Sequence, residues 1–305
     1  MKINNIAKRA FTLIEIMVAT VIMVVLVGLV IQITSEVLKV WTRSSGKLAA
    51  NAEARIAMDM ITQDLETAVF RNNGQQWLRV DGPELLASGA PYASQTVALK
   101  LFTPAMDRDK FEVDGVTPIP GDICGVAYRL AYQESYDQSG ITDKVKVYAL
   151  YRAIERPDNT FTFLMGSRND TASPQVILDD SGPSFWLESN ITSASNYLVS
   201  NIVDFKVLIY ESDPAVTFPV PVNADDTTLA LDGDYAYGGS DATLQGGAQL
   251  QLLYADVILT VVSDAGLEIL SLPSLAGTGY DDADDVVREY GEVFTRRVNF
   301  MARPL

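Results

Sequence analysis

The chain has 305 residues, of which 48% are apolar and 20% are charged, and its formal net charge is −16. This composition supports a substantial core and excludes a wholly disordered chain, while the negative charge argues against unaided binding to nucleic acid. The sequence has no histidine and a single cysteine, Cys124, which excludes a Ser-His-Asp triad, a thiolate zinc site and an internal disulfide.

The first predicted element is an apolar helix near the N-terminus. A short basic leader, residues 1–10, ends in Lys8-Arg9-Ala10, and the residues from Phe11 to Ile33 are almost all apolar. That run is long enough to span a bilayer, which needs about 20 residues. Glu15 is the one ionisable residue inside it. An acid in a membrane-spanning helix is costly, so Glu15 predicts a functional role with a partner.

Three interpretations compete for residues 1–33. A cleaved secretory signal has an apolar core of roughly 7–15 residues, which is shorter than this run. An ordinary signal anchor accounts for the length, but explains neither Glu15 nor a leader that stops at Ala10. The third interpretation is a prepilin-type N-terminus. For Glu15 alone, the structural alternative is an acid at the helix end that snorkels to the membrane surface.

The sequence FTLIE at residues 11–15 resembles the N-terminus of type IV pilins and of the pseudopilins of type II secretion. The resemblance implies that a prepilin peptidase cuts between Ala10 and Phe11, and that the new amino terminus at Phe11 is methylated. It also implies that Glu15 neutralises this amine, on its own chain or on a neighbour, during filament assembly. The family usually has glycine where this chain has Ala10.

Residues 34–72 are predicted to continue the helix with one apolar face. Met58, Ile61 and Leu65 recur at spacings of three and four. The opposite face is assigned to polar residues, namely Asp59, Gln63, Asp64 and Glu66. An arginine followed by asparagine and glycine at 71–74 predicts the end of the helix there.

Residues 73–305 are predicted to form a β-rich globular domain, because apolar side chains now alternate with period two. The candidate strands are Thr96–Phe102, Ile123–Gln133, Lys144–Ile154, Thr160–Met165, Asn201–Glu211, Leu250–Val262 and Val293–Phe300. Cys124 falls in one of these strands and is expected to be a buried, inert thiol. Trp41, Trp77 and Trp186 are expected to pack in the core. The predicted fold class is α+β and pilin-like: a long N-terminal helix, with a membrane-spanning first half, packed on antiparallel sheet.

The order of these elements looks like the J-type minor pseudopilin of type II secretion. The resemblance rests on GVAYRLAYQ at 125–133, VYALYRAIER at 147–156, LVSNIVDFKVLIYES at 198–212 and EVFTRRVNF at 292–300. It implies other pseudopilins as partners, of the I-, K- and major types, contacted through the N-terminal helices. The chain is longer than typical J proteins, and the extra residues fall in the loops 103–121 and 213–248.

Acidic loop residues raise the possibility of a calcium site, since calcium binds carboxylate and carbonyl oxygens. The candidate ligands are Asp225, Asp226, Asp232 and Asp234, without EF-hand spacing. Solvated loop charge is the favoured explanation, so no cofactor is expected. No phosphate loop, nucleophile elbow or metalloprotease motif occurs, and we do not expect an enzyme.

The resemblance therefore implies a minor pseudopilin at or near the tip of a type II secretion pseudopilus. It would be a single-pass protein of the inner membrane, with a cytoplasmic leader and an extracytoplasmic C-terminal domain. One alternative is a minor pilin of a type IV pilus, serving adhesion, motility or DNA uptake. Another is a signal-anchored enzyme or ligand-binding protein.

Overall fold

The structure, a computed structural model, forms two compact units, residues 1–46 and 47–305. Helix α1 (Leu13–Glu66) has 54 residues; it supplies the first unit and opens the second. The residues described are 12–70, 76–86, 90–92, 95–111, 115–134, 146–165, 178, 184–212, 221–224, 231, 233–238, 251–272 and 274–300.

Helix α1 ends earlier than the sequence predicted. Its last residue is Glu66, not one in the 71–74 stretch. The reason is a sheet contact: the Val69 N–H donates to the Phe102 carbonyl at 2.8 Å, which draws the chain out of the helix. Phe70 is then buried, with its ring edge-on to those of Tyr237 and Phe300.

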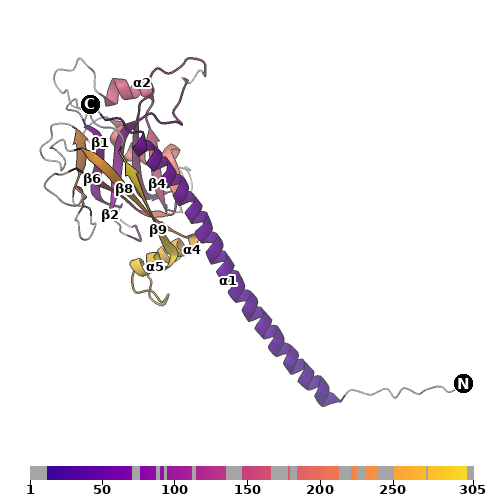
Figure 1. Cartoon of the computed structure of the whole chain (residues 1–305). Coiled ribbons are helices and arrows are strands. Elements are labelled where there is room, and N and C mark those ends of the chain that lie inside the picture. Colours follow the sequence, from indigo (N-terminus) through magenta and orange to yellow (C-terminus); the bar gives the residue numbers. More distant parts are fainter. Residues whose placement is uncertain are drawn as a thin grey trace. The chain divides into compact units, whose positions relative to one another are not determined.

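Two antiparallel sheets lie in the second unit beside α1 (Figure 1). The larger has the strand order β5-β4-β3-β2-β1-β7, and the smaller has the order β6-β8-β9. The strands of the larger sheet are β1 (Gln76–Leu85), β2 (Gln95–Thr103), β3 (Cys124–Glu134), β4 (Lys146–Ile154), β5 (Tyr197–Ser200) and β7 (Tyr235–Gly238). Those of the smaller sheet are β6 (Ile202–Glu211), β8 (Leu252–Val262) and β9 (Gly291–Asn299). The α+β fold class is confirmed.

One predicted strand is wrong. Residues 160–165 form a helical turn, η1 (Thr160–Leu164), which follows the short helix α2 (Pro157–Asn159). Pro157 starts the turn, and the Thr160 hydroxyl accepts the buried Gly125 N–H at 2.9 Å. Thr160 and Leu164 are buried one turn apart, while Phe161 and Phe163 are exposed. The alternation of TFTFL therefore reflects one buried helical face and not a pleated strand.

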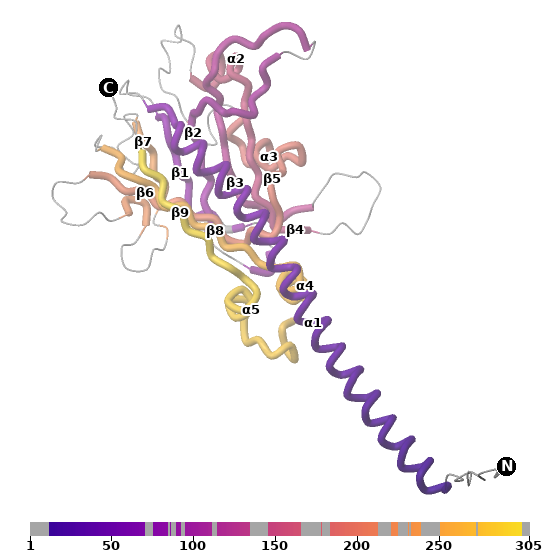
Figure 2. The backbone as a smooth tube through the Cα atoms, turned by 45° about the vertical axis from the view of Figure 1, so that its right-hand side comes forward, coloured from indigo at the N-terminus to yellow at the C-terminus, as the bar shows by residue number. Residues whose placement is uncertain are grey.

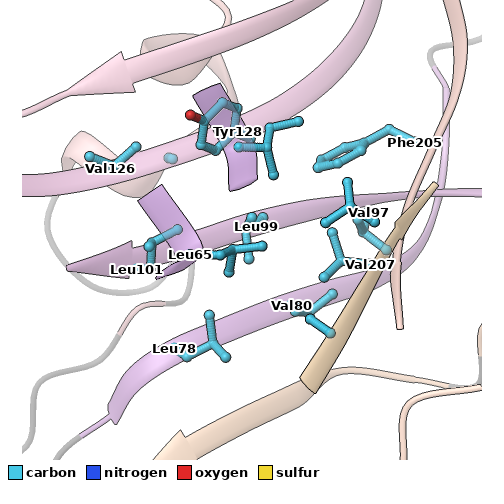
Figure 3. Close-up of a cluster of buried hydrophobic side chains, with 14 of the residues drawn as sticks. Leu65, Leu78, Val80, Val97, Leu99, Leu101, Val126, Tyr128, Phe205 and Val207 are labelled. Carbon is cyan, nitrogen blue, oxygen red and sulfur yellow. The ribbon is translucent and has the colours of Figure 1, made fainter. Parts of the chain in front are cut away.

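The main core lies where the second half of α1 packs on the sheets. Figure 3 shows Leu65 of α1 among Leu78, Leu99 and Leu101 of the larger sheet, with Val207 of β6 nearby. Met58, Ile61 and Leu65 are buried, which confirms the predicted apolar face. Cys124 is buried too, and burial raises the pKa of its thiol to about 11. Trp77 and Trp186 are core residues as expected, whereas Trp41 is 73% exposed, so its assignment to the core was wrong.

Short helices and turns complete the second unit. They are η2 (Ser184–Trp186), α3 (Glu188–Ile191), η3 (Ala194–Asn196), α4 (Asp264–Leu270) and α5 (Ala283–Tyr290). In both views α2 lies at one end of this unit, and α4 and α5 lie at the other (Figures 1 and 2). Lys47, the first residue of the unit, donates to the Glu289 carbonyl at the α5 end.

Candidate functional site

The apolar run at the start of α1 has no protein packed on it within the described part of the chain. Between Leu13 and Ile33, every large apolar side chain is 48% to 77% exposed. Among the described helices, α1 alone is long and apolar enough to cross a membrane. An apolar surface of this extent is not stable in water. It fits a membrane anchor, and it also offers a face to other apolar helices.

Glu15 lies at the first turn of this run and is held by Thr12. The Thr12 N–H and the Thr12 hydroxyl both donate to Glu15 Oε2 at 3.1 Å, and the Glu15 N–H donates back to Thr12 Oγ1 at 3.4 Å. Thr12 is the N-cap, since the Ile16 N–H donates to its carbonyl at 3.3 Å. This reciprocal pattern is a capping box, which satisfies N–H groups that the first turn leaves unpaired.

The capping box offsets part of the cost of placing the Glu15 carboxylate in an apolar helix, but not all of it. Both bonds from Thr12 reach the same oxygen, and Glu15 Oε1 has no partner among the residues that the structure describes. Ile16, Ala19, Thr20 and Met23 line a shallow depression beside the carboxylate. A charge in such surroundings is costly unless a cation or further donors approach it. The geometry thus leaves one carboxylate oxygen available to a second molecule.

Most of the other candidate residues lie outside the described part of the chain. These are Ala10 and Phe11 at the cleavage position, and Asp225, Asp226 and Asp232 of the calcium proposal. Asp234 is described, and its carboxylate accepts from Arg79 Nη2 at 3.2 Å and from the Gly82 N–H at 2.9 Å. No group of three metal-binding side chains occurs among the described residues.

The structure reveals a buried polar network in the second unit that the sequence interpretation missed. Asp64 of α1 accepts from the Tyr128 hydroxyl of β3 and from Arg152 of β4. The Arg152 guanidinium also pairs with Asp107 at 2.6 Å. Burial raises the pKa of Tyr128, and the neighbouring Asp64 carboxylate adds to that rise. Burial opposes the charge of Arg152, yet Tyr128 and Asp64 raise the pKa of its guanidinium. The network therefore ties α1 to the sheet.

Two sequence signals could have found these missed residues. Thr12 and Glu15 have the Thr-x-x-Glu spacing of a capping box, placed directly before an apolar run. Asp64 had been assigned to the polar face of α1, but it is buried. It lies three residues after Ile61 and seven after Ala57, both buried, and such a spacing repeats on one helix face.

A second ionic cluster lies on the other face of the larger sheet. Lys100 of β2 is fully buried and pairs with Asp81 of β1 at 2.8 Å. Arg129 of β3 bridges Glu84 of β1, at 2.9 Å, and Glu188 of α3, at 3.1 Å. Burial raises the pKa of Glu84 to about 7, although Arg129 acts in the opposite direction. These contacts hold the segment around α3 against the sheet.

No protein-family model matches the chain, and a search of curated proteins finds no match. Among solved structures, a type IV-like pilin from Thermus thermophilus is similar, with 11% sequence identity and a TM-score of 0.33; the match covers 83% of this chain and 97% of that one. At this level the likeness carries no functional assignment. The fold class rests on the helix and sheets described above.

Proposed function

We propose that the chain is a membrane-anchored minor pilin-like subunit, most similar to a J-type pseudopilin of type II secretion. Prepilin peptidase would cut it between Ala10 and Phe11, and the new terminus would be methylated. Its first helix would then assemble with the helices of other pseudopilins, and its acidic second unit would lie outside the cytoplasmic membrane. A place in a type IV pilus is the nearest alternative, because it uses the same features.

One observation carries this proposal: Glu15 is the only charged residue in an exposed apolar segment, and one of its carboxylate oxygens has no partner among the described residues. A membrane anchor alone has no use for an acid there, since the charge opposes insertion. A neighbouring subunit that brings a terminal amine to Glu15 would offset this cost, because opposite charges attract strongly in a low-dielectric environment. Small side chains at Ala19 and Thr20 would permit close helix packing.

The test compares three variants expressed in the native host. Glu15→Leu should remain in the membrane fraction but lose filament assembly and the dependent secretion. Glu15→Gln, which keeps hydrogen bonding but not charge, should lose most of both. Glu36→Gln is the matched control, because Glu36 is a charged residue of the same helix that lies beyond the apolar run and pairs with Lys39. It should assemble normally.

N-terminal sequencing of membrane-extracted protein tests the processing step separately. A mature chain that begins with methylated Phe11 supports the proposal. An intact Met1, or a cut beyond Gly28, contradicts it and favours the signal-anchored enzyme or binding protein. A normal assembly level of Glu15→Leu contradicts the charge-pairing role even where processing is correct.

A further inference from the structure

At the end of the second unit that holds α2, a pocket of about 400 Å³ opens between α1, the loop 107–109, the end of β4 and the η3–β5 segment. We call it the distal pocket and define it by Met60, Arg108, Asp109, Arg152, Arg156 and Tyr197. Its volume suits a side chain or a short peptide segment. Three arginines line this pocket together with two acids, Asp107 and Asp109, in a chain whose net charge is −16.

The three arginines differ in how many of their guanidinium nitrogens already donate a hydrogen bond. Arg152 forms the floor, and its three nitrogens are all bonded within the buried network. Arg108 uses Nη1 for the Ala105 carbonyl and Nη2 for Asp122, which leaves its Nε without a partner among the described residues. Arg156 uses Nε and Nη2 for Asp158, and its Nη1 is likewise unpartnered in the described part of the chain.

The acids that pair with these two arginines are at least partly exposed to solvent. The Asp122 side chain is 77% exposed, and that of Asp158 is 31% exposed. The exposed Arg108–Asp122 pair contributes little, about 0–1 kcal/mol, whereas Asp158 holds Arg156 through two hydrogen bonds. A ligand carboxylate could therefore add to the unused donors, or displace Asp122, at small cost. Each of these two arginines keeps one unused guanidinium nitrogen, and guanidinium donors bind carboxylates through charge-assisted hydrogen bonds, so a carboxylate that reaches both nitrogens is the ligand we expect.

Exposed apolar side chains lie on the same two segments that supply Arg108 and Arg156. Met106 and Phe111 flank Arg108 in sequence, and Phe161 and Phe163 follow Arg156; each is 46% or more exposed. Gly121, which precedes the Asp122 partner of Arg108, packs against the second segment, because a Cβ added at Gly121 would lie only 2.9 Å from the Phe161 ring. Methionine, aromatic residues and arginine are enriched in protein interfaces. This combination favours a polypeptide over a small free acid.

We propose that the distal pocket binds an extended segment of a partner protein through an acidic side chain, with apolar neighbours of that acid packing on Met106, Phe161 and Phe163. The carboxylate contacts Arg108 and Arg156, while Arg152 positions the floor. This inference goes beyond the assembly role proposed for Glu15, because it concerns the second unit alone.

The test uses the full-length protein in detergent micelles and two synthetic five-residue peptide libraries. One library has a fixed central glutamate, the other a fixed central glutamine, and the flanking positions vary in both. The protein should retain peptides of the glutamate library that carry apolar neighbours, and it should retain few from the glutamine library. Equal retention from both libraries, or none from either, overturns the proposal.

Variants then locate the binding. Arg156→Gln and Arg108→Gln should each weaken binding of the best retained peptide by about tenfold, as loss of a charge-assisted contact predicts. Arg288→Gln is the matched control. Arg288 also pairs with an aspartate that is close to it in sequence, Asp285, but it lies on α5. It should bind normally, and unchanged binding by both pocket variants overturns the proposal.

Two checks keep the result interpretable. Each variant's cooperative unfolding is followed by tryptophan fluorescence, and if one arginine variant fails to fold, the other carries the test. Free glutarate is added as a competitor. If glutarate displaces bound peptide as effectively as added free peptide does, the pocket recognises small carboxylates, and the assignment to a polypeptide is overturned.

Discussion

Helix α1 carries one carboxylate among apolar residues near each of its ends, and the two have different partners. Asp64 is buried in the second unit and bonded to Tyr128 and Arg152, side chains far away in sequence. Glu15 is bonded only to Thr12, within its own first turn, among the described residues. An acid whose charge is balanced by a distant arginine holds the fold together. An acid balanced only by a local cap remains available to another molecule.

The largest effect should come from breaking the Asp64 network. Asp64→Leu leaves buried Arg152 without one of its two carboxylate partners among the described residues, Asp64 and Asp107, and removing one member of a buried pair typically costs about 3–5 kcal/mol. Urea unfolding of the full-length protein in detergent, followed by the fluorescence of buried Trp77 and Trp186, should show that loss.

Asp59→Leu is the matched control for this change. Asp59 also lies on α1 and also pairs with an arginine, Arg296, but the two side chains are 70% and 47% exposed. Its loss should cost less than about 1 kcal/mol. If the Asp64 and Asp59 variants lose equal amounts, the buried network has no special role in holding α1 to the sheet.

Glu84 lies between the two extremes, because its partner Arg129 does not fully offset its burial. Its folded-state pKa is raised from 4.5 to about 7. A raised carboxyl pKa contributes stability below the unfolded pKa, near pH 4.5, and this contribution is lost as the pH rises through about 7. The protein should therefore lose up to about 3 kcal/mol of unfolding free energy between pH 5 and pH 8 through this group.

Glu84→Gln should remove most of that pH dependence, because glutamine stays neutral throughout. Urea unfolding at pH 5 and at pH 8 measures it. Glu188→Gln alters the other carboxylate on the same guanidinium, one that is 56% exposed, and should leave the pH dependence largely in place. A wild-type protein equally stable at both pH values would contradict the raised pKa.

The sequence predicted the repeating patterns well and the single exceptions poorly. The apolar run, the buried face around Ile61 and most of the central strands follow from periodicity, which many residues determine together. Strand β1 was missed, because its charged residues Arg79 and Asp81 obscure the pattern; the structure buries both as an ion pair. Strands β5 and β7 are only four residues long, too short for a periodic signal.

Tertiary contacts explain the errors in the candidate sites as well. Asp64 looks like a surface residue until strands 64 and 88 residues away supply Tyr128 and Arg152. The distal pocket combines residues from α1, the loop 107–109, β4 and the η3–β5 segment, and no local motif marks it. Glu15 could be singled out from sequence because its surroundings are set by the local apolar run alone.

The smallest predicted effect concerns Glu15, the carboxylate that only the local Thr12 cap holds. Thr12→Val keeps the shape of the side chain but removes the hydroxyl that bonds Glu15 twice. Loss of an N-cap costs typically about 1 kcal/mol, so amide hydrogen exchange in micelles should speed up about fivefold at Glu15 and Ile16, whose N–H groups donate to Thr12. Thr20→Val is the control, because the Thr20 hydroxyl donates to the Met17 carbonyl further along the same exposed helix. It should leave the exchange of the first turn unchanged. Unchanged exchange in Thr12→Val would show that the cap does not hold Glu15, and that its carboxylate is already free for a partner before assembly.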